Sequence, residues 1–185
     1  MASTASAESV GATPALRRLY VIRFAFAIAW AALLLVSGSE LTVAARLLLF
    51  LYPAFDVVAA VVDARSARAA GPVRGLYANM AVSLLAAVGV AVAGASGVAD
   101  VLRVWGAWAV VSGLVQLLVG VARRPMGGQW AMILSGGISV LAGASFIRSA
   151  SQDAPSLTAL AGYATLGGIF FLVSAIRLSR SAPRF

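Results

Sequence analysis

The chain of 185 residues contains no cysteine, no histidine and no lysine, and few charged residues of any kind. The missing cysteine excludes disulfides and thiolate metal sites, and the missing histidine removes the commonest general base and metal ligand. All 14 basic residues are arginine, which stays protonated and accepts no proton. The sequence has no Walker A motif, nucleophile elbow, dinucleotide fingerprint or metal-ligand spacing. We therefore predict a protein that is not an enzyme and holds no cofactor or metal.

The composition is that of a membrane protein. Hydrophobic residues make up 62% of the chain and charged residues 11%, and the mean hydropathy is +0.97. A soluble domain is about 45–50% apolar and about 25% charged. The net charge of +8 comes from arginines in short segments between apolar runs, with no basic stripe among aromatic residues. This pattern favours contact with anionic lipid headgroups over nucleic-acid binding.

Six apolar segments follow one another along the chain, over residues 19–37, 41–62, 76–99, 104–122, 129–147 and 154–176. Each is close to the ~20 residues that a helix needs to cross a ~30 Å hydrocarbon core. The segments do not alternate polar with apolar residues, as barrel strands would. We predict an all-α, polytopic membrane protein of six transmembrane helices, arranged as three hairpins.

The predicted domain organisation is one membrane domain between two tails. Residues 1–16 are small and polar and are predicted to form a disordered cytoplasmic tail. The six-helix domain covers residues 17–180, with hairpin repeats at about 17–66, 74–124 and 128–180, and residues 181–185 form a second cytoplasmic tail.

The arginines are distributed unequally between the two sides of the predicted membrane. Ten flank one side: Arg17, Arg18, Arg65, Arg68, Arg74, Arg123, Arg124, Arg177, Arg180 and Arg184. Three flank the other: Arg46, Arg103 and Arg148. The positive-inside rule then places the ten-arginine side, and both termini, in the cytoplasm of a bacterial plasma (inner) membrane. Arg103 is also spaced for an i,i+3 contact with Asp100.

The three hairpins look like copies of one unit. Their first helices open with an aromatic residue, Tyr20, Tyr77 or Trp130, of the kind that anchors helix ends at headgroup level. Their second helices each end in arginine on the same side. A unit that holds two spans repeats in parallel, and three such units favour a packed bundle with approximate three-fold arrangement.

Short motifs of small and aromatic residues recur in the second helices of these units. The second unit carries Gly106, Trp108, Ser112, Gly113, Gly120 and Arg123, and the third carries Gly162, Tyr163, Gly167, Gly168 and Arg177. The pattern resembles the HdeD-like family of small bacterial membrane proteins over about residues 17–180. The first unit departs from it, with Phe50 near the first glycine position and Asp56-Val57 in place of the small pair. The resemblance implies a role in acid or other stress.

Four polar residues inside the spans form a candidate layer. Arg23 and Asp56 lie at matched depth when the first hairpin is folded about its turn, and so do Asn79 and Gln116 in the second hairpin. A lone charge at the centre of a membrane helix costs on the order of 3 kcal/mol, and pairing offsets much of that cost. We predict that Arg23 and Asp56 form an ion pair or share a polar cavity, and that Asn79 and Gln116 are placed to form a hydrogen bond between helices.

Two functions fit this layer. The first is a non-enzymatic membrane protein that packs against lipid, a second copy or a membrane partner, with Arg23 and Asp56 as a structural pair. The alternative is a small transporter or channel in which Asp56 titrates along a proton or ion pathway. Asp56→Asn leaves the first function nearly unchanged and abolishes the second.

Overall fold

The computed structural model describes residues 2–37, 40–67, 74–122, 124–126 and 129–180. Its helices are α1 (Ala2–Ser37), α2 (Val43–Ala67), α3 (Arg74–Ser96), α4 (Val98–Ala122), the short 3-10 helix η1 (Arg124–Met126), α5 (Trp130–Ser149) and α6 (Thr158–Arg180). Six of them, all but η1, are long and apolar enough to span a membrane. The prediction of an all-α protein with six spans is confirmed.

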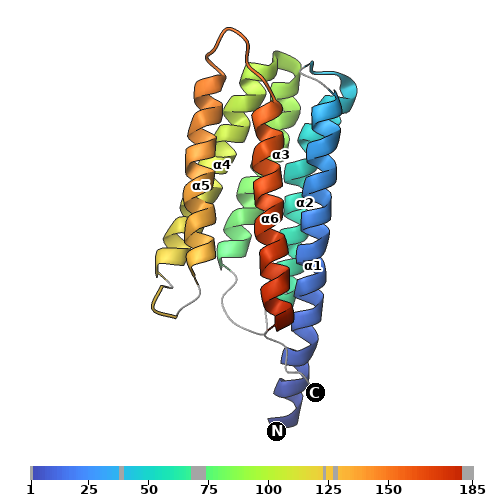
Figure 1. The fold of residues 1–185 in the computed structure, drawn as a ribbon, viewed down its shortest axis with the longest axis vertical. Coiled ribbons are helices and arrows are strands. Elements are labelled where there is room, and N and C mark those ends of the chain that lie inside the picture. Colours follow the sequence, from blue (N-terminus) through green and yellow to red (C-terminus); the bar gives the residue numbers. More distant parts are fainter. Residues whose placement is uncertain (1, 38–39, 68–73, 123, 127–128, 181–185) are drawn as a thin grey trace.

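The six long helices run alternately up and down and form a ring in chain order, in which α6 returns to lie against α1 (Figure 1). The most extensive contacts are between α4 and α5, followed by those between α1 and α6 and between α2 and α3. All three are contacts between different hairpins rather than within one. Within the hairpins the helices touch less, and α5 and α6 touch least.

The predicted spans match the helices to within five residues at each end, apart from two larger differences. The turn of the second hairpin lies at Gly97, as predicted, where a φ of 136° favours glycine; α4 therefore begins at Val98, earlier than predicted. The other difference is at the N-terminus, where α1 already begins at Ala2 instead of following a disordered tail over residues 1–16. Alanine, the best helix former, recurs in this stretch and favours a helix continuous with the span. The tail predicted for residues 181–185 lies outside the described residues.

Small and aromatic side chains fill the inside of the ring, and large aliphatic side chains cover the outside. Buried alanines line the contacts between helices, while Trp30 and Trp105 are at most 2% exposed. Large apolar side chains such as Val36, Leu85 and Leu141 are more than 70% exposed. This distribution suits a helix bundle in lipid, where small residues let helix backbones approach and the apolar exterior needs no cover.

Glycines make the contact between α4 and α5 unusually close. A Cβ added at Gly113 would lie 2.7 Å from the carbonyl oxygen of Gly136, and one added at Gly143 would lie 2.5 Å from that of Gly106. Gly106, Gly113 and Gly120 recur every seventh residue on α4, so they share one face. These glycines belong to the small-residue motifs found in the sequence, and they hold the two backbones together.

Candidate functional site

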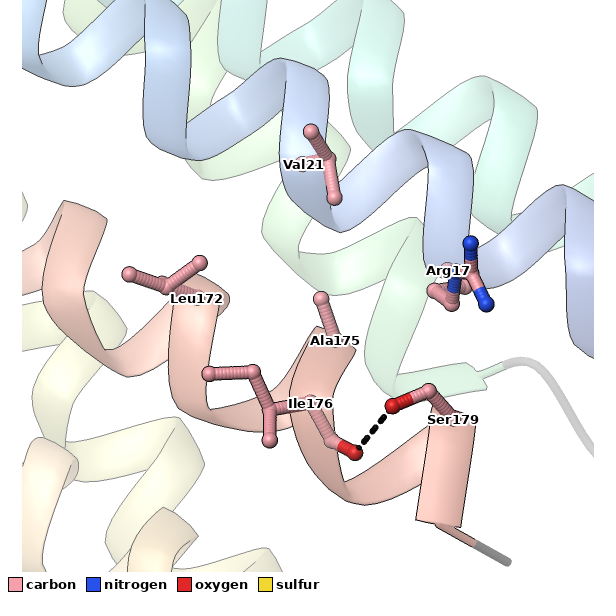
Figure 2. A pocket seen from close by; sticks show the side chains of 6 residues that line it. All are labelled: Arg17, Val21, Leu172, Ala175, Ile176 and Ser179. Carbon is pink, nitrogen blue, oxygen red and sulfur yellow. Dashed lines mark hydrogen bonds between the residues drawn. The ribbon is translucent and has the colours of Figure 1, made fainter. Parts of the chain in front are cut away.

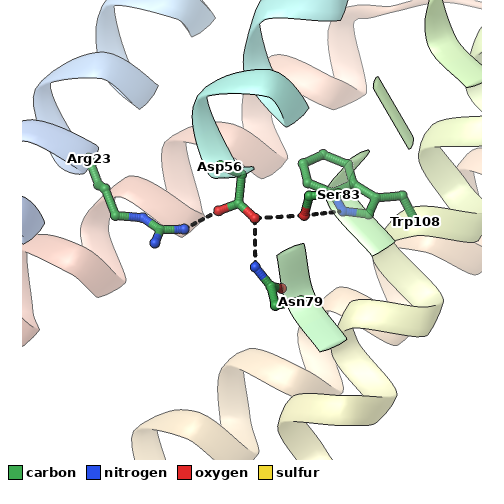
Figure 3. A network of polar contacts seen from close by, with 5 residues as sticks. All are labelled: Arg23, Asp56, Asn79, Ser83 and Trp108. Carbon is green, nitrogen blue, oxygen red and sulfur yellow. Dashed lines mark hydrogen bonds and ion pairs between the residues drawn. The ribbon is translucent and has the colours of Figure 1, made fainter. Parts of the chain in front are cut away.

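The candidate site is a network of polar side chains around the carboxylate of Asp56, in the middle of α2 (Figure 3). The guanidinium of Arg23 on α1 forms an ion pair with Oδ1 of Asp56. Oδ2 accepts two hydrogen bonds from α3, one of 2.8 Å from Nδ2 of Asn79 and one of 2.8 Å from Oγ of Ser83. Both oxygens of the carboxylate are therefore engaged by donors on neighbouring helices.

The network extends to two further helices. Ser83 Oγ accepts a hydrogen bond of 3.2 Å from Nε1 of Trp108 on α4 while it donates to Asp56 (Figure 3). On the other side, Cζ of Arg23 lies 4.2 Å from the ring centroid of Phe171 on α6, within the range of a cation–π contact. Through these contacts one carboxylate connects α1, α2, α3, α4 and α6.

The charged pair is largely withdrawn from the surface. The side chains of Arg23 and Asp56 are each 13% exposed, and Ser83 is fully buried. Opposite charges in contact cancel each other's field, so the network brings little net charge into the span. Removing one partner would leave the other charge unpaired in an apolar setting, which is far costlier than the pair itself.

The sequence positions these groups by simple helical geometry. Arg23 and Asp56 lie at the same depth because the first hairpin folds back at its turn, as predicted. Asn79 and Ser83 are four residues apart, so they lie on the same face of α3 and reach the same carboxylate oxygen. Ala59 and Ala60, three and four residues after Asp56 and thus one turn further along α2, are both buried.

The predicted bond between Asn79 and Gln116 is wrong. Asn79 donates to Asp56, and within the part of the chain that the structure describes no hydrogen bond joins Gln116 to the network. Matching depth aligned Gln116 with Asn79 along the membrane normal, but depth alone does not specify which face of a helix a residue occupies. The α4 residue that reaches the network is Trp108, two turns earlier in the helix.

Three members of the network were not predicted from the sequence: Ser83, Trp108 and Phe171. The sequence does contain a signal for Ser83, because its i,i+4 spacing from Asn79 places both residues on the same face of a helix. Trp108 and Phe171 gave no such signal, because a tryptophan or phenylalanine in an apolar helix is typical of core packing.

Four aromatic rings pack next to the network and fill the centre of the ring of helices. Trp105 stacks on Trp30 at 5.4 Å and meets Trp108 edge-on at 5.1 Å between ring centroids. Tyr52 touches all three, with centroids 4.6 Å from Trp30, 5.3 Å from Trp105 and 6.1 Å from Trp108. We refer to Trp30, Tyr52, Trp105 and Trp108 as the aromatic cluster. Tyr52 of this cluster lies one turn before Asp56 on α2, and Trp108 donates to Ser83 of the network.

The cluster is fixed to the backbone at one point. Trp30 Nε1 donates a hydrogen bond of 2.6 Å to the carbonyl oxygen of Leu48 on α2, one turn before Pro53. Pro53 has no N–H, so it cannot donate to the carbonyl of Leu49, which is the neighbour of the carbonyl that this indole binds. By contrast, Nε1 of Trp105 and Oγ of Ser112 are buried without a hydrogen-bond partner among the described residues. Trp105 is therefore held by packing of its ring against its neighbours rather than by a hydrogen bond.

One hydrogen bond joins α5 and α6, the two neighbouring helices that touch least. Tyr163 on α6 donates a hydrogen bond of 3.0 Å to Ser139 on α5, and its ring meets Phe146 edge-on at 5.6 Å. In the first two turns of α4, at the end of the bundle away from the start of α1, Arg103 and Asp100 form the predicted i,i+3 ion pair at 2.5 Å, with side chains 53% and 42% exposed. That exposed pair contrasts with the partly buried pair of Arg23 and Asp56.

No protein-family model, no curated protein and no solved structure matches the chain. The class of protein therefore rests on the fold and the network: this is an integral membrane protein whose described residues form six long apolar helices with a partly buried ion pair and an aromatic cluster between them.

Proposed function

We propose that this chain is a non-enzymatic protein of the bacterial plasma membrane that acts through contacts of its helices with lipid, a second copy or a membrane partner. The observation that carries the proposal is the set of partners that engage the carboxylate of Asp56. Both carboxylate oxygens of Asp56 are engaged by Arg23, Asn79 and Ser83, and the aromatic cluster fills the adjacent space. A relay needs a group free to exchange protons with water, whereas this carboxylate joins helices together.

The distribution of arginine supports an orientation with both termini in the cytoplasm. Arg17, Arg18, Arg65, Arg124 and Arg180 are exposed, and all lie at the end of the bundle where α1 begins and α6 ends. Arg68, Arg123 and Arg184 belong to the same side by sequence and lie outside the described residues. The positive-inside rule assigns this side to the cytoplasm.

A reporter fused to the C-terminus tests the orientation. A fluorescent protein that folds only in the cytoplasm should be bright, and a phosphatase that is active only outside it should be inactive. The opposite result for both reporters would refute the proposed orientation, and it would leave the description of the fold unchanged.

The resemblance to the HdeD-like family supports a stress-related role. We expect cells that lack the protein to survive acid challenge less well than cells that regain it from a plasmid. The matched control is a plasmid that carries Asp100→Ala, which removes a carboxylate of the exposed pair and should restore survival. Equal survival with and without the protein, over the acid range tested, would remove the stress role.

One observation favours the alternative, a small transporter or channel: polar groups of α1, α2 and α3 meet inside the span at Asp56. The deciding experiment is dissipation of a pH gradient in liposomes that contain purified protein, with wild type beside Asp56→Asn. We expect neither protein to leak more than empty liposomes. A leak through wild type that Asp56→Asn abolishes would favour the transporter and refute the proposed function.

A further inference from the structure

Two hollows lie at the end of the bundle where α1 begins and α6 ends. One of about 210 Å³ lies between the two helices (Figure 2), and one of about 390 Å³ lies beside α1. The smaller hollow is lined by Arg17, Val21, Leu172, Ala175, Ile176 and Ser179. The larger is lined by Pro14, Arg17, Arg18 and Val21. Arg17 and Val21 border both hollows, and we call the two hollows together the α1–α6 groove.

The groove follows from a change in packing along the two helices. Further inside the span, α1 and α6 touch closely: a Cβ added at Gly168 would lie 3.1 Å from the Cβ of Ala27. Two turns later in α6 the residue at the contact is Ala175, which is buried and small. In Figure 2 its side chain and that of Val21 lie between the helices, while larger apolar side chains stand to one side. The space is left because no large side chain fills it.

The depth of the groove matches the boundary between headgroups and hydrocarbon. From Arg17 to Val36, α1 rises about 29 Å at about 1.5 Å per residue, which is close to the ~30 Å thickness of a bilayer core. Arg17 therefore lies at headgroup level. Val21 lies one turn further into the membrane, and Ser179 closes the groove at the level of Arg17 (Figure 2).

The polar end of the groove is positively charged. Arg17 and Arg18 are both exposed, and Arg180 in the last turn of α6 is exposed as well. Neither lining includes an acidic residue among the residues described. The other end is apolar, with Val21 45% and Ile176 42% exposed. A ligand that fits both ends has an anionic head and a hydrocarbon tail.

We propose that the α1–α6 groove binds an anionic phospholipid. The phosphate lies between the guanidinium groups of Arg17 and Arg18, and one acyl chain lies along Val21, Leu172 and Ile176. Arginine holds phosphate through charge-assisted and bidentate hydrogen bonds, and basic pockets between membrane helices on the cytoplasmic side suit anionic headgroups. The site deepens the proposed function by naming one lipid contact, and it rests on that function.

A zwitterionic lipid of the same chain length fits the apolar end but not the charged end. Its headgroup carries an ammonium group, which Arg17 and Arg18 repel, so selectivity for net negative charge is the signature of this site. Free inorganic phosphate fits the charged end only and gains nothing from the hydrocarbon contact. A second copy of the chain would fill the apolar end without regard to lipid charge.

The test measures lipid retained by the purified full-length protein, by native mass spectrometry, after exchange into detergent with equal amounts of phosphatidylglycerol and phosphatidylcholine of identical chains. We expect wild type to retain phosphatidylglycerol selectively. Arg17→Gln with Arg18→Gln should bind it roughly thirtyfold more weakly, the factor expected when two arginines near an anionic headgroup are lost. Val21→Trp fills the hollow from an exposed position and should also lower retention.

The matched control is Arg124→Gln with Arg148→Gln, which removes the same charge from exposed positions elsewhere and should retain lipid like wild type. Equal retention of the two lipids, unchanged retention in the arginine or Val21→Trp variants, or displacement by millimolar inorganic phosphate would each overturn the site. A dimer that Val21→Trp abolishes would also overturn it, in favour of a second copy. Helical content by circular dichroism checks folding, and if the arginine variant does not fold, Val21→Trp decides. Gradient dissipation in liposomes tests the proposed function separately, so the two can fail independently.

Discussion

Replacing Asp56 by alanine should be one of the most destabilising single changes in the protein. The substitution removes the ion pair with Arg23 and the acceptor for Asn79 and Ser83, and it leaves a guanidinium that is 13% exposed without its counter-charge. Trp108 still donates to the hydroxyl of Ser83, but that hydroxyl has lost the carboxylate to which it donated. The change therefore affects four helices through one side chain.

The expected cost follows from these contacts. Interhelical hydrogen bonds in membranes are worth about 0.6 kcal/mol each, so the two from α3 account for about 1 kcal/mol. An unpaired arginine costs on the order of 3 kcal/mol at the centre of a span and less near its end. For Arg23, which lies about 9 Å further in than Arg17 along α1, about 2 kcal/mol is reasonable. The sum of about 3 kcal/mol agrees with the range measured when one partner of a buried pair is removed.

The assay is reversible unfolding in mixed micelles with increasing sodium dodecyl sulfate, followed by tryptophan fluorescence, since Trp108 reports on the network directly. The double variant Arg23→Leu with Asp56→Leu removes both charges and should be more stable than Asp56→Ala by 1 kcal/mol or more, because no charge is left unpaired. A cost below about 1 kcal/mol for Asp56→Ala, or a double variant no better than the single one, would refute the reasoning.

Further predictions use the same unfolding assay. Asp100→Ala breaks the exposed pair with an arginine one turn away and should cost less than about 1 kcal/mol; a cost equal to that of Asp56→Ala would contradict the argument from burial. Gly143→Ala places a Cβ 2.5 Å from a backbone oxygen of α4 and should cost about 2 kcal/mol, whereas Gly137→Ala, with nothing within 4 Å, should cost nothing. Trp30→Phe removes the hydrogen bond to α2 and should cost about 1 kcal/mol. Tyr163→Phe should speed hydrogen exchange in α5 and leave α4 unchanged, because it removes the bond between α5 and α6; equal change in both helices would count against it.

Most of the fold could be predicted because lipid imposes one dominant requirement. A helix must be about 20 apolar residues long to cross the core, so the six spans and the turn near Gly97 could be recognised from hydropathy and glycine alone. The order of helices around the ring could not, because it depends on which faces fit together. That fit resides in features such as the glycines of α4 and α5, whose partners the sequence does not specify.

The candidate site could also be predicted only in part from the sequence. Arg23 and Asp56 share a depth within one hairpin, and two opposite charges at one depth have a strong reason to meet. Asn79 was identified by its polarity, but its partner was wrong, since Asp56 competes for its donor better than Gln116 does. A charged acceptor forms a stronger hydrogen bond than a neutral amide.

The ring has a consequence for how the protein is made. Arg23 and Asp56 belong to the first two spans, so their charges can neutralise each other as soon as that hairpin has left the ribosome. The surface of α1 that packs on α6 has no partner until the last span is synthesised, and Phe171 reaches Arg23 only then. Insertion of the costly charge is therefore an early, local event, while closure of the bundle waits for the end of translation. A chain that stops after the fifth helix would keep its ion pair but leave an open seam along its first span.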